Sequence, residues 1–218
     1  MSFDYLIDHW RTVLDLTIEH LALASTALLI GVIVALPLTL LATSMPAFRT
    51  PVFILVDALY TIPSLAFLAF LIPSLGLGRD PAVVVLAAYA QLALVRNFTA
   101  GLRGVSAEVL GSAAGIGMTR SQTLLRVRLP LALPVLIAGF RIATVSTISL
   151  ATVTAWINAG GLGSLLFDGI SRDNPSMILA GTVAICALAL SADLLLRWVE
   201  SLTPAARVQR LVSSRTTT

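Results

Sequence analysis

Long uncharged apolar segments are the feature of this sequence that most limits how it can fold. The first runs from Leu21 to Ala42, and about 20 apolar residues are enough for a helix to cross the hydrocarbon core of a bilayer. The chain is 57% hydrophobic and 11% charged, whereas a soluble domain carries about 25% charged residues. Because helices satisfy their own backbone hydrogen bonds in lipid, the sequence predicts an all-α membrane protein with a single membrane domain.

Five segments are apolar enough to form membrane-spanning helices. They are expected at 21–42, 58–77, 81–95, 134–158 and 175–192, within a transmembrane domain of residues 20–200. The third is a little short, and it can continue if Arg96 extends its guanidinium to the membrane boundary. The same behaviour is expected of Arg141 in the fourth, whereas Asp193 and Arg197 are expected to end the fifth.

The first 19 residues show a different pattern. Apolar residues recur there at helical spacing with acidic residues and Arg11 between them, which predicts an amphipathic helix at residues 1–19 lying on the outer membrane surface. The two histidines, His9 and His20, lack partners at metal-ligand spacing and are interpreted as polar residues of the membrane interface. At the other end, residues 201–218 are predicted to form a polar cytoplasmic tail.

The distribution of basic residues predicts the orientation of the chain. All 14 basic residues are arginines, and short loops rich in such residues stay in the cytoplasm. With the N-terminus outside, Arg11, Arg79 and Arg172 lie outside and the remaining 11 of the 14 lie inside. We therefore expect a multi-pass protein of the bacterial plasma (inner) membrane with a cytoplasmic C-terminus. This asymmetry explains the pI near 9.7 without binding to nucleic acid.

Composition also limits the chemistry that the chain can perform. Without Lys it cannot form a phosphate-binding loop of the kind that needs a Lys to reach the terminal phosphates. The single cysteine, Cys186, excludes a disulfide within the chain and makes a Cys-based metal site implausible. No catalytic residue, metal site or bound cofactor is expected, and the chain is predicted to move a solute across the membrane without being an enzyme.

The longest stretch between predicted spans, from about residue 101 to 133, carries signals for two short helices. Ser106 and Glu108 favour a helix start, with the acid near its positive end. Gly115 and Gly117 then break the chain, Thr119 with Gln122 forms a capping box, and Pro130 is expected to end the second helix. Such a pair, in a cytoplasmic loop at 104–133, would form a knob suited to a groove in another protein.

Two further places interrupt the predicted spans. Thr61, Pro63 and Ser64 fall in the middle of the second, where a proline frees carbonyl groups that lipid cannot satisfy. This break either contributes to a translocation path or is a packing kink. After the fourth span, Asn158 precedes Gly160 and Gly161, which allow an unwound turn or a close backbone approach near the outer face. The simpler alternative is a helix end followed by a turn.

The knob resembles the cytoplasmic signature of the permeases of bacterial ABC importers. That signature is Glu-Ala-Ala, three residues, Gly, nine residues, Ile, one residue and Leu-Pro, and its spacing is reproduced by Gly111, Ser112, Ala113, Gly117, Val127, Leu129 and Pro130. The residues match less well than the spacing, because Gly111 replaces the Glu and Ser112 the first Ala. The resemblance implies a coupling helix that contacts an ATPase subunit, involving Gly111, Ser112, Ala113, Gly115, Gly117, Met118, Thr119, Arg120, Gln122, Leu129 and Pro130.

Other segments resemble one branch of that family, the glycine betaine, carnitine and choline (osmoprotectant) importers. They include DALYTIPSLAF at 57–67, LVRNFTAGL at 94–102 and AGGLGSLLFDGI at 159–170. The branch implies a fold of the methionine-importer type and an external gate that includes Asn158, Gly160 and Gly161.

The implied partners are the lipid bilayer, a second permease chain in a homo- or heterodimer, cytoplasmic ATPases that bind ATP and Mg, and an extracytoplasmic substrate-binding protein. Aromatic residues show no clustering by spacing, so selectivity is assigned to the binding protein. A permease for methionine, sulfonate or another small solute is the alternative within the class. A channel, a secondary transporter and a membrane scaffold are alternatives outside it.

Overall fold

The computed structural model describes residues 4–203, and all regular elements in that range are helical. In chain order they are α1 (Asp4–Asp8), α2 (Trp10–Ser44), α3 (Pro46–Thr61), α4 (Ser64–Leu75), α5 (Arg79–Arg103), α6 (Ala107–Gly115), α7 (Arg120–Thr123), a π-helical turn (Leu124–Arg128), α8 (Leu129–Thr154), a 3-10 turn (Ala155–Ile157), α9 (Gly163–Ser171) and α10 (Pro175–Ser201). In this part of the chain, four continuous helical segments are long and apolar enough to span a membrane, and the bent pair α3 and α4 can supply a fifth span. This agrees with the predicted all-α membrane fold.

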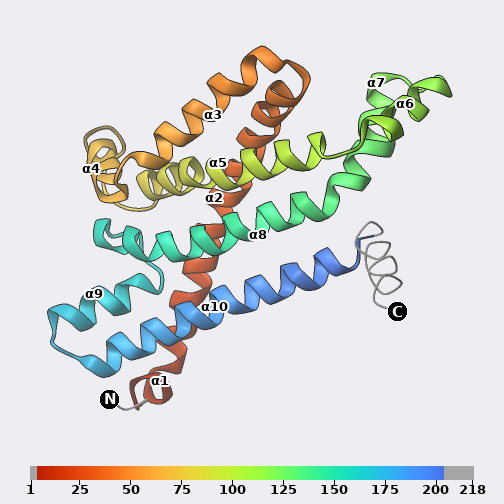
Figure 1. Cartoon of the computed structure of the whole chain (residues 1–218). Helices are drawn as coiled ribbons and strands as arrows, with labels where there is room; N and C mark the ends of the chain where they lie inside the picture. The colour runs from red at the N-terminus through yellow and green to blue at the C-terminus, as the bar shows by residue number, and fades with distance from the viewer. Residues whose placement is uncertain (1–3, 204–218) are drawn as a thin grey trace.

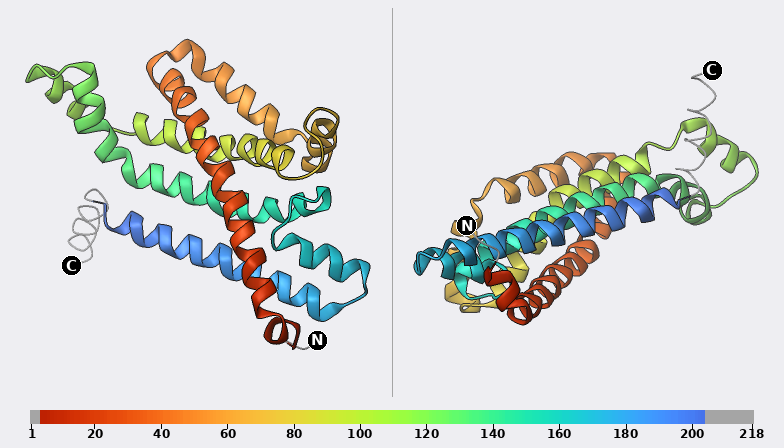
Figure 2. Two further views of the ribbon diagram at one scale, coloured as in Figure 1. Left: turned by 180° about the vertical axis from the view of Figure 1, so that it is seen from behind. Right: turned by 90° about the horizontal axis from the view of Figure 1, so that it is seen from below.

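The spanning helices are packed around α5, which is the most buried of them. α2 and α8 pack against α5, and α10 packs on α8 (Figure 1; Figure 2). α2 approaches α5 closely because Gly31 lacks a side chain: a Cβ there would lie 3.4 Å from the Cβ of Ala90. Gln91 on α5 donates from Nε2 to the carbonyl of Gly31 at 3.0 Å, which ties the two helices at a point where no water is available.

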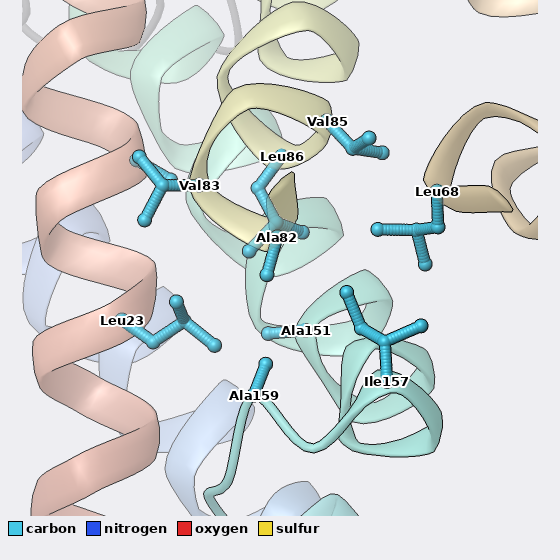
Figure 3. Close-up of a cluster of buried hydrophobic side chains, with 10 residues drawn as sticks. Leu23, Leu68, Ala82, Val83, Val85, Leu86, Ala151, Ile157 and Ala159 are labelled. Carbon is cyan, nitrogen blue, oxygen red and sulfur yellow. The ribbon is translucent and has the colours of Figure 1, made fainter. Parts of the chain in front are cut away.

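Two groups of short elements lie at opposite ends of this bundle. α1, α4 and α9 are at one end, whereas α6, α7 and the last turns of α10 are at the other (Figure 1). The first end is held by an apolar cluster that joins α2, α4, α5, α8 and the turn after α8. Its labelled members in Figure 3, called the turn cluster below, are Leu23, Leu68, Ala82, Val83, Val85, Leu86, Ala151, Ile157 and Ala159.

The predicted second span is wrong in its bounds. It was placed at 58–77, but α3 begins at Pro46, and α4 leaves it at an angle of 91° after Thr61. Ile62 and Pro63 between them are extended. Pro63 cannot donate the hydrogen bond that would continue α3 and disfavours helical backbone at Ile62. The break foreseen in the middle of a span is therefore the corner between two helices.

From Trp10 on, the segment before the first span is helical, as predicted, but no helix end separates this part from that span. α2 is continuous over its 35 residues, or about 52 Å at 1.5 Å per residue, against roughly 30 Å of hydrocarbon. The buried Val13 on the apolar face of this segment packs with Leu162 and Leu165 of the α9 region and with Met177 of α10. The apolar face thus packs at least partly on protein.

Two predicted helix ends are also wrong. Pro130 does not end a helix, because α7, the π-helical turn, α8 and the 3-10 turn form one helical segment from Arg120 to Ile157. In the π-helical turn the N–H of Leu129 reaches the carbonyl of Leu124, five residues back, and Pro130, which has no N–H to donate, follows this widened turn directly without breaking the segment. The fifth span does not end at Asp193 and Arg197 either, since α10 continues to Ser201.

Arg141 accounts for the longer α10. Its guanidinium lies 3.3 Å from the carboxylate of Asp193 and 3.4 Å from that of Glu200, and Arg197 pairs with Asp193 at 2.7 Å one turn on. Arg141 therefore has protein partners, and the interpretation that it only extends its charge to the membrane boundary is wrong. Because an unpaired charge in this region is costly, acids placed on α10 allow that helix to run alongside α8 beyond the apolar segment.

Candidate functional site

The α6–α7 hairpin is built by local signals that the sequence displays. Ser106 caps α6, with its Oγ accepting the N–H of Val109 at 3.4 Å. At α7, the N–H of Gln122 donates to Oγ1 of Thr119 at 3.3 Å, and the N–H of Thr119 donates to Oε1 of Gln122 at 2.9 Å. The predicted capping box is confirmed.

Gly117 makes the sharp turn between the two helices. Its φ is +81°, a left-handed conformation that only glycine adopts without strain. The N–H groups of Gly117 and Met118 donate to the carbonyls of Ala114 and Ala113 at 2.9 and 3.1 Å, which satisfies the end of α6. The two short helices thus form a knob that projects from one end of the bundle (Figure 1).

Most of the residues predicted for ATPase coupling are exposed on this hairpin. The exposed ones are Gly111, Ser112, Gly115, Gly117, Thr119, Arg120 and Gln122. Ala113 is buried, Met118 is half-buried, and Leu129 and Pro130 are exposed on the first turn of α8. The predicted set therefore divides into a knob and the start of the helix that carries it.

Sequence reasoning missed an apolar residue at the tip of the knob. Ile116 lies between the turn glycines and is 80% exposed, and Leu125 on the next helical turn is 62% exposed. Large apolar side chains gathered on a segment that otherwise faces water mark a contact surface. The isoleucine itself could have indicated this contact surface, because a turn between Gly115 and Gly117 does not require an apolar residue to form.

The corner between α3 and α4 places the break residues beside α5. Thr61 donates from Oγ1 to the carbonyl of Ala58 at 2.8 Å, which closes the last turn of α3. The carbonyl of Ile62, left without a helical donor by the break, accepts the hydroxyl of Tyr89 on α5. Thr61 and Pro63 are exposed and Ser64 is half-buried. The three predicted residues form the corner itself.

A cavity of about 430 Å³ lies next to this corner, between the end of α3, α5 and the middle of α8. Its lining includes Tyr60, Tyr89 and three hydroxyl residues of α8, Ser146, Thr147 and Ser149. The two tyrosine rings are 5.4 Å apart. The spacing of the tyrosines in the sequence did not predict this contact, because they are on helices that meet only through tertiary packing.

The turn after α8 has left-handed backbone at three of its residues. Asn158 has a φ of +63°, Gly160 of +80° and Gly161 of +77°. Asn158 is exposed, Gly160 is half-buried and Gly161 is buried. The turn is linked to the α3–α4 corner by the turn cluster, where Ile157 packs with Leu68 of α4 (Figure 3). The two groups predicted for the path and gate therefore lie on opposite sides of one apolar cluster.

Glu19 and His20 of α2 hold this turn from the side. The N–H of Gly161 donates to the carboxylate of Glu19 at 2.9 Å. His20 is fully buried, and its Nε2 donates to the carbonyl of Ile148 at 3.0 Å, because a carbonyl can only accept. His20 is thus a buried tie between α2 and α8, and its interpretation as an interfacial residue is wrong.

The glycines at 160 and 161 also leave room for these side chains. A Cβ at Gly160 would lie 2.2 Å from a carboxylate oxygen of Glu19, and one at Gly161 would lie 2.9 Å from Nδ1 of His20. Sequence reasoning identified the glycines but missed both partners. The signal was two adjacent polar residues at the edge of a long apolar segment, and nothing local connected them to a turn 140 residues later.

Transport proteins of known name resemble this chain in sequence. The family model of the binding-protein-dependent transport system inner membrane component matches residues 27–203. A choline transport system permease protein of Bacillus subtilis (strain 168) is 42% identical over 196 residues, covering 89% of this chain and 90% of the relative. A carnitine transport permease protein of Listeria monocytogenes is 40% identical, covering 87% of this chain and 88% of the relative.

Solved structures share the fold at lower identity. An inward-facing structure of the MetNI methionine ABC transporter has a TM-score of 0.74 and 21% identity, and the match covers 91% of this chain and 99% of that one. An amino acid ABC transporter with histidines has a TM-score of 0.77 and 16% identity, with 92% of this chain and 98% of that one covered. At these identities the likeness concerns the fold, which agrees with the expected methionine-importer type.

Proposed function

Because the chain belongs to the family of inner membrane components of binding-protein-dependent transport systems, we propose that it is the permease subunit of an ATP-driven importer of small osmoprotectants. The solutes are quaternary ammonium compounds such as glycine betaine, carnitine or choline. Relatives at 40% or more identity, aligned over most of both chains, carry choline and carnitine permease names. The methionine transporter shares only the fold, at 21% identity.

One observation of the structure carries the mechanical part of this proposal. The exposed hairpin is continuous with a membrane helix, since α7, the π-helical turn, α8 and the 3-10 turn form one helical segment of 38 residues. A partner that grips the hairpin can therefore move α8, whose middle lines the cavity and whose far end enters the glycine turn. Force applied at one end of the molecule reaches the other without a flexible joint.

The partners in this proposal are those of the family in general. Cytoplasmic ATPase subunits bind ATP and Mg and grip the hairpin, a second permease chain completes the path, and an external binding protein delivers the solute. This chain binds no nucleotide and performs no hydrolysis. The N-terminus is outside and the C-terminus is cytoplasmic in the bacterial inner membrane, which the arginine distribution supports.

Transport by the reconstituted complex tests the proposal. The permease is copurified with its ATPase and second permease chain, placed in proteoliposomes with the binding protein, and supplied with labelled choline or glycine betaine. We expect uptake that requires both internal ATP and the binding protein. Uptake that proceeds without the ATPase would contradict the importer assignment, and ATP-dependent uptake of methionine in place of both quaternary ammonium compounds would contradict the solute class.

The hairpin has its own test, with a control glycine at the other end of the molecule. Gly117 and Gly76 both have positive φ, +81° and +77°, and a Cβ at either position meets no atom within 4 Å. Valine at either site therefore introduces backbone strain without a clash, and Gly76, with a ψ of −172°, is a demanding control because side chains are almost excluded from that conformation. We expect G117V to lower ATPase copurification about ten-fold or more and G76V, at the other end of the molecule, to leave it unchanged. Equal effects of the two variants would contradict the docking role of the hairpin.

A further inference from the structure

The cavity beside the α3–α4 corner is lined by two tyrosines, by hydroxyl residues of α8 and by apolar side chains. Tyr60 is 50% exposed there, Tyr89 is half-buried, and Ser146 and Ser149 are exposed. Polar side chains at membrane depth generally face a water-filled cavity or the interior of the bundle, and not lipid. The volume of about 430 Å³ is within the range of small-molecule sites, about 300–1,000 Å³.

The two tyrosine rings are held in place from different elements. The Tyr89 hydroxyl donates to the carbonyl of Ile62, the group that the break in the helix leaves free. Tyr60 is on the last turn of α3, and its ring lies 5.4 Å from that of Tyr89, with an angle of 51° between the ring planes. Both rings line the cavity as a tilted pair of the kind that aromatic side chains prefer, and the corner at Pro63 sets their relation.

The charge of the lining is as informative as its rings. The nine residues that line the cavity include no acidic and no basic side chain. A cation bound there has the electron-rich faces of Tyr60 and Tyr89 and the hydroxyl oxygens of α8 as its partners. This environment suits a bulky cation, which several aromatic and hydroxyl groups can surround more completely than one carboxylate can. The absence of an acid in the lining keeps binding weak, as passage through a membrane requires.

We propose that this cavity is a transit site for the quaternary ammonium group of the transported solute. Tyr60 and Tyr89 hold the cation on their ring faces, and the hydroxyl groups of Ser146 and Ser149 bind the polar remainder. The site adds a second selection step inside the permease to the one made by the external binding protein. This inference rests on the proposed solute class and would lose its meaning without it.

Progressive fluorination of an aromatic ring tests the interaction, because fluorine weakens the negative ring face with little change in shape. Position 60 is filled with Phe, then with singly and triply fluorinated Phe, and then with Leu, in the complete transporter with its ATPase and binding protein. Uptake of labelled choline and binding-protein-stimulated ATP hydrolysis are both measured in proteoliposomes. The control is F70L, which removes an aromatic ring that is 77% exposed on α4 and does not line the cavity.

We expect choline uptake to fall in the order Phe, singly fluorinated, triply fluorinated and Leu, with Y60L slower than wild type by about three- to ten-fold. ATP hydrolysis should stay near the wild-type rate in all of them, since the hairpin is untouched, and F70L should transport normally. A flat fluorination series, or a loss of uptake that ATP hydrolysis follows in parallel, would overturn the transit site and leave the proposed function intact. If the wild-type complex takes up no quaternary ammonium compound at all, both proposals fail together.

Discussion

The two ends of this molecule each depend on glycines at a sharp turn, but the turns are held in different ways. In the hairpin, the turn at Gly117 is fixed by helix caps within a few residues, and the space around it is open. In the turn after α8, Gly160 and Gly161 are fixed by Glu19 and His20, which are distant in sequence and in direct contact. A turn built locally can move as one body with the helix that carries it, whereas a turn clamped by another helix moves only if that clamp releases.

The largest expected effect is at Gly160. G160A combines a left-handed φ of +80° with a Cβ only 2.2 Å from the Glu19 carboxylate, and together strain and overpacking should lower the free energy of unfolding by about 2–5 kcal/mol. Thermal unfolding of the purified protein in detergent measures this. G117A is the control for strain alone, because Gly117 has a φ of +81° with open space around it. If the two variants unfold at the same temperature, the turn after α8 is not clamped.

The clamp itself is tested at Glu19. E19A removes the acceptor for the N–H of Gly161, and loss of a charge-assisted hydrogen bond of this kind should cost about 1–3 kcal/mol of unfolding free energy. E19Q keeps an acceptor oxygen and should cost less. D15A provides the comparison, since Asp15 is an exposed carboxylate one turn earlier on α2. An E19A protein as stable as D15A would show that the contact does not hold the turn.

These differences explain how far the sequence could lead. The caps at Ser106 and Thr119 were predictable because each one depends on residues three positions apart. The partners of Gly160, the pairing of Arg141 with α10, and the meeting of Tyr60 with Tyr89 were not, since each joins helices whose relative placement no local pattern encodes. Pro130 misled for a related reason: a proline usually disrupts a helix in its interior, but the π-helical turn directly before Pro130 keeps the helical segment continuous, and that turn was not visible in the residue pattern.

A smaller and more local effect is expected in the hairpin. T119A removes one half of the capping box. The loss is worth about 0.5–2 kcal/mol, but the cap stabilises only α7 and not the rest of the fold. We expect faster amide hydrogen exchange in α7 and weaker ATPase association, with the overall unfolding temperature unchanged. S121A is the control, because Ser121 is an exposed hydroxyl residue of the same helix with no part in the cap. A global loss of stability in T119A would mean that the hairpin is not an independent local structure.

The smallest effect has the opposite sign and contrasts most directly with Gly160. Gly111 is inside α6 with ordinary helical backbone, and a Cβ there would meet nothing within 4 Å. Because alanine favours helix over glycine by about 0.8–1.0 kcal/mol, G111A should stabilise α6 and slow the exchange of its amides by about four-fold. Glycine is thus required at the clamped turn and replaceable in the exposed helix. Faster exchange in G111A would show that α6 also has a packing constraint at Gly111. The two ends would then differ only in how strongly their glycines are constrained.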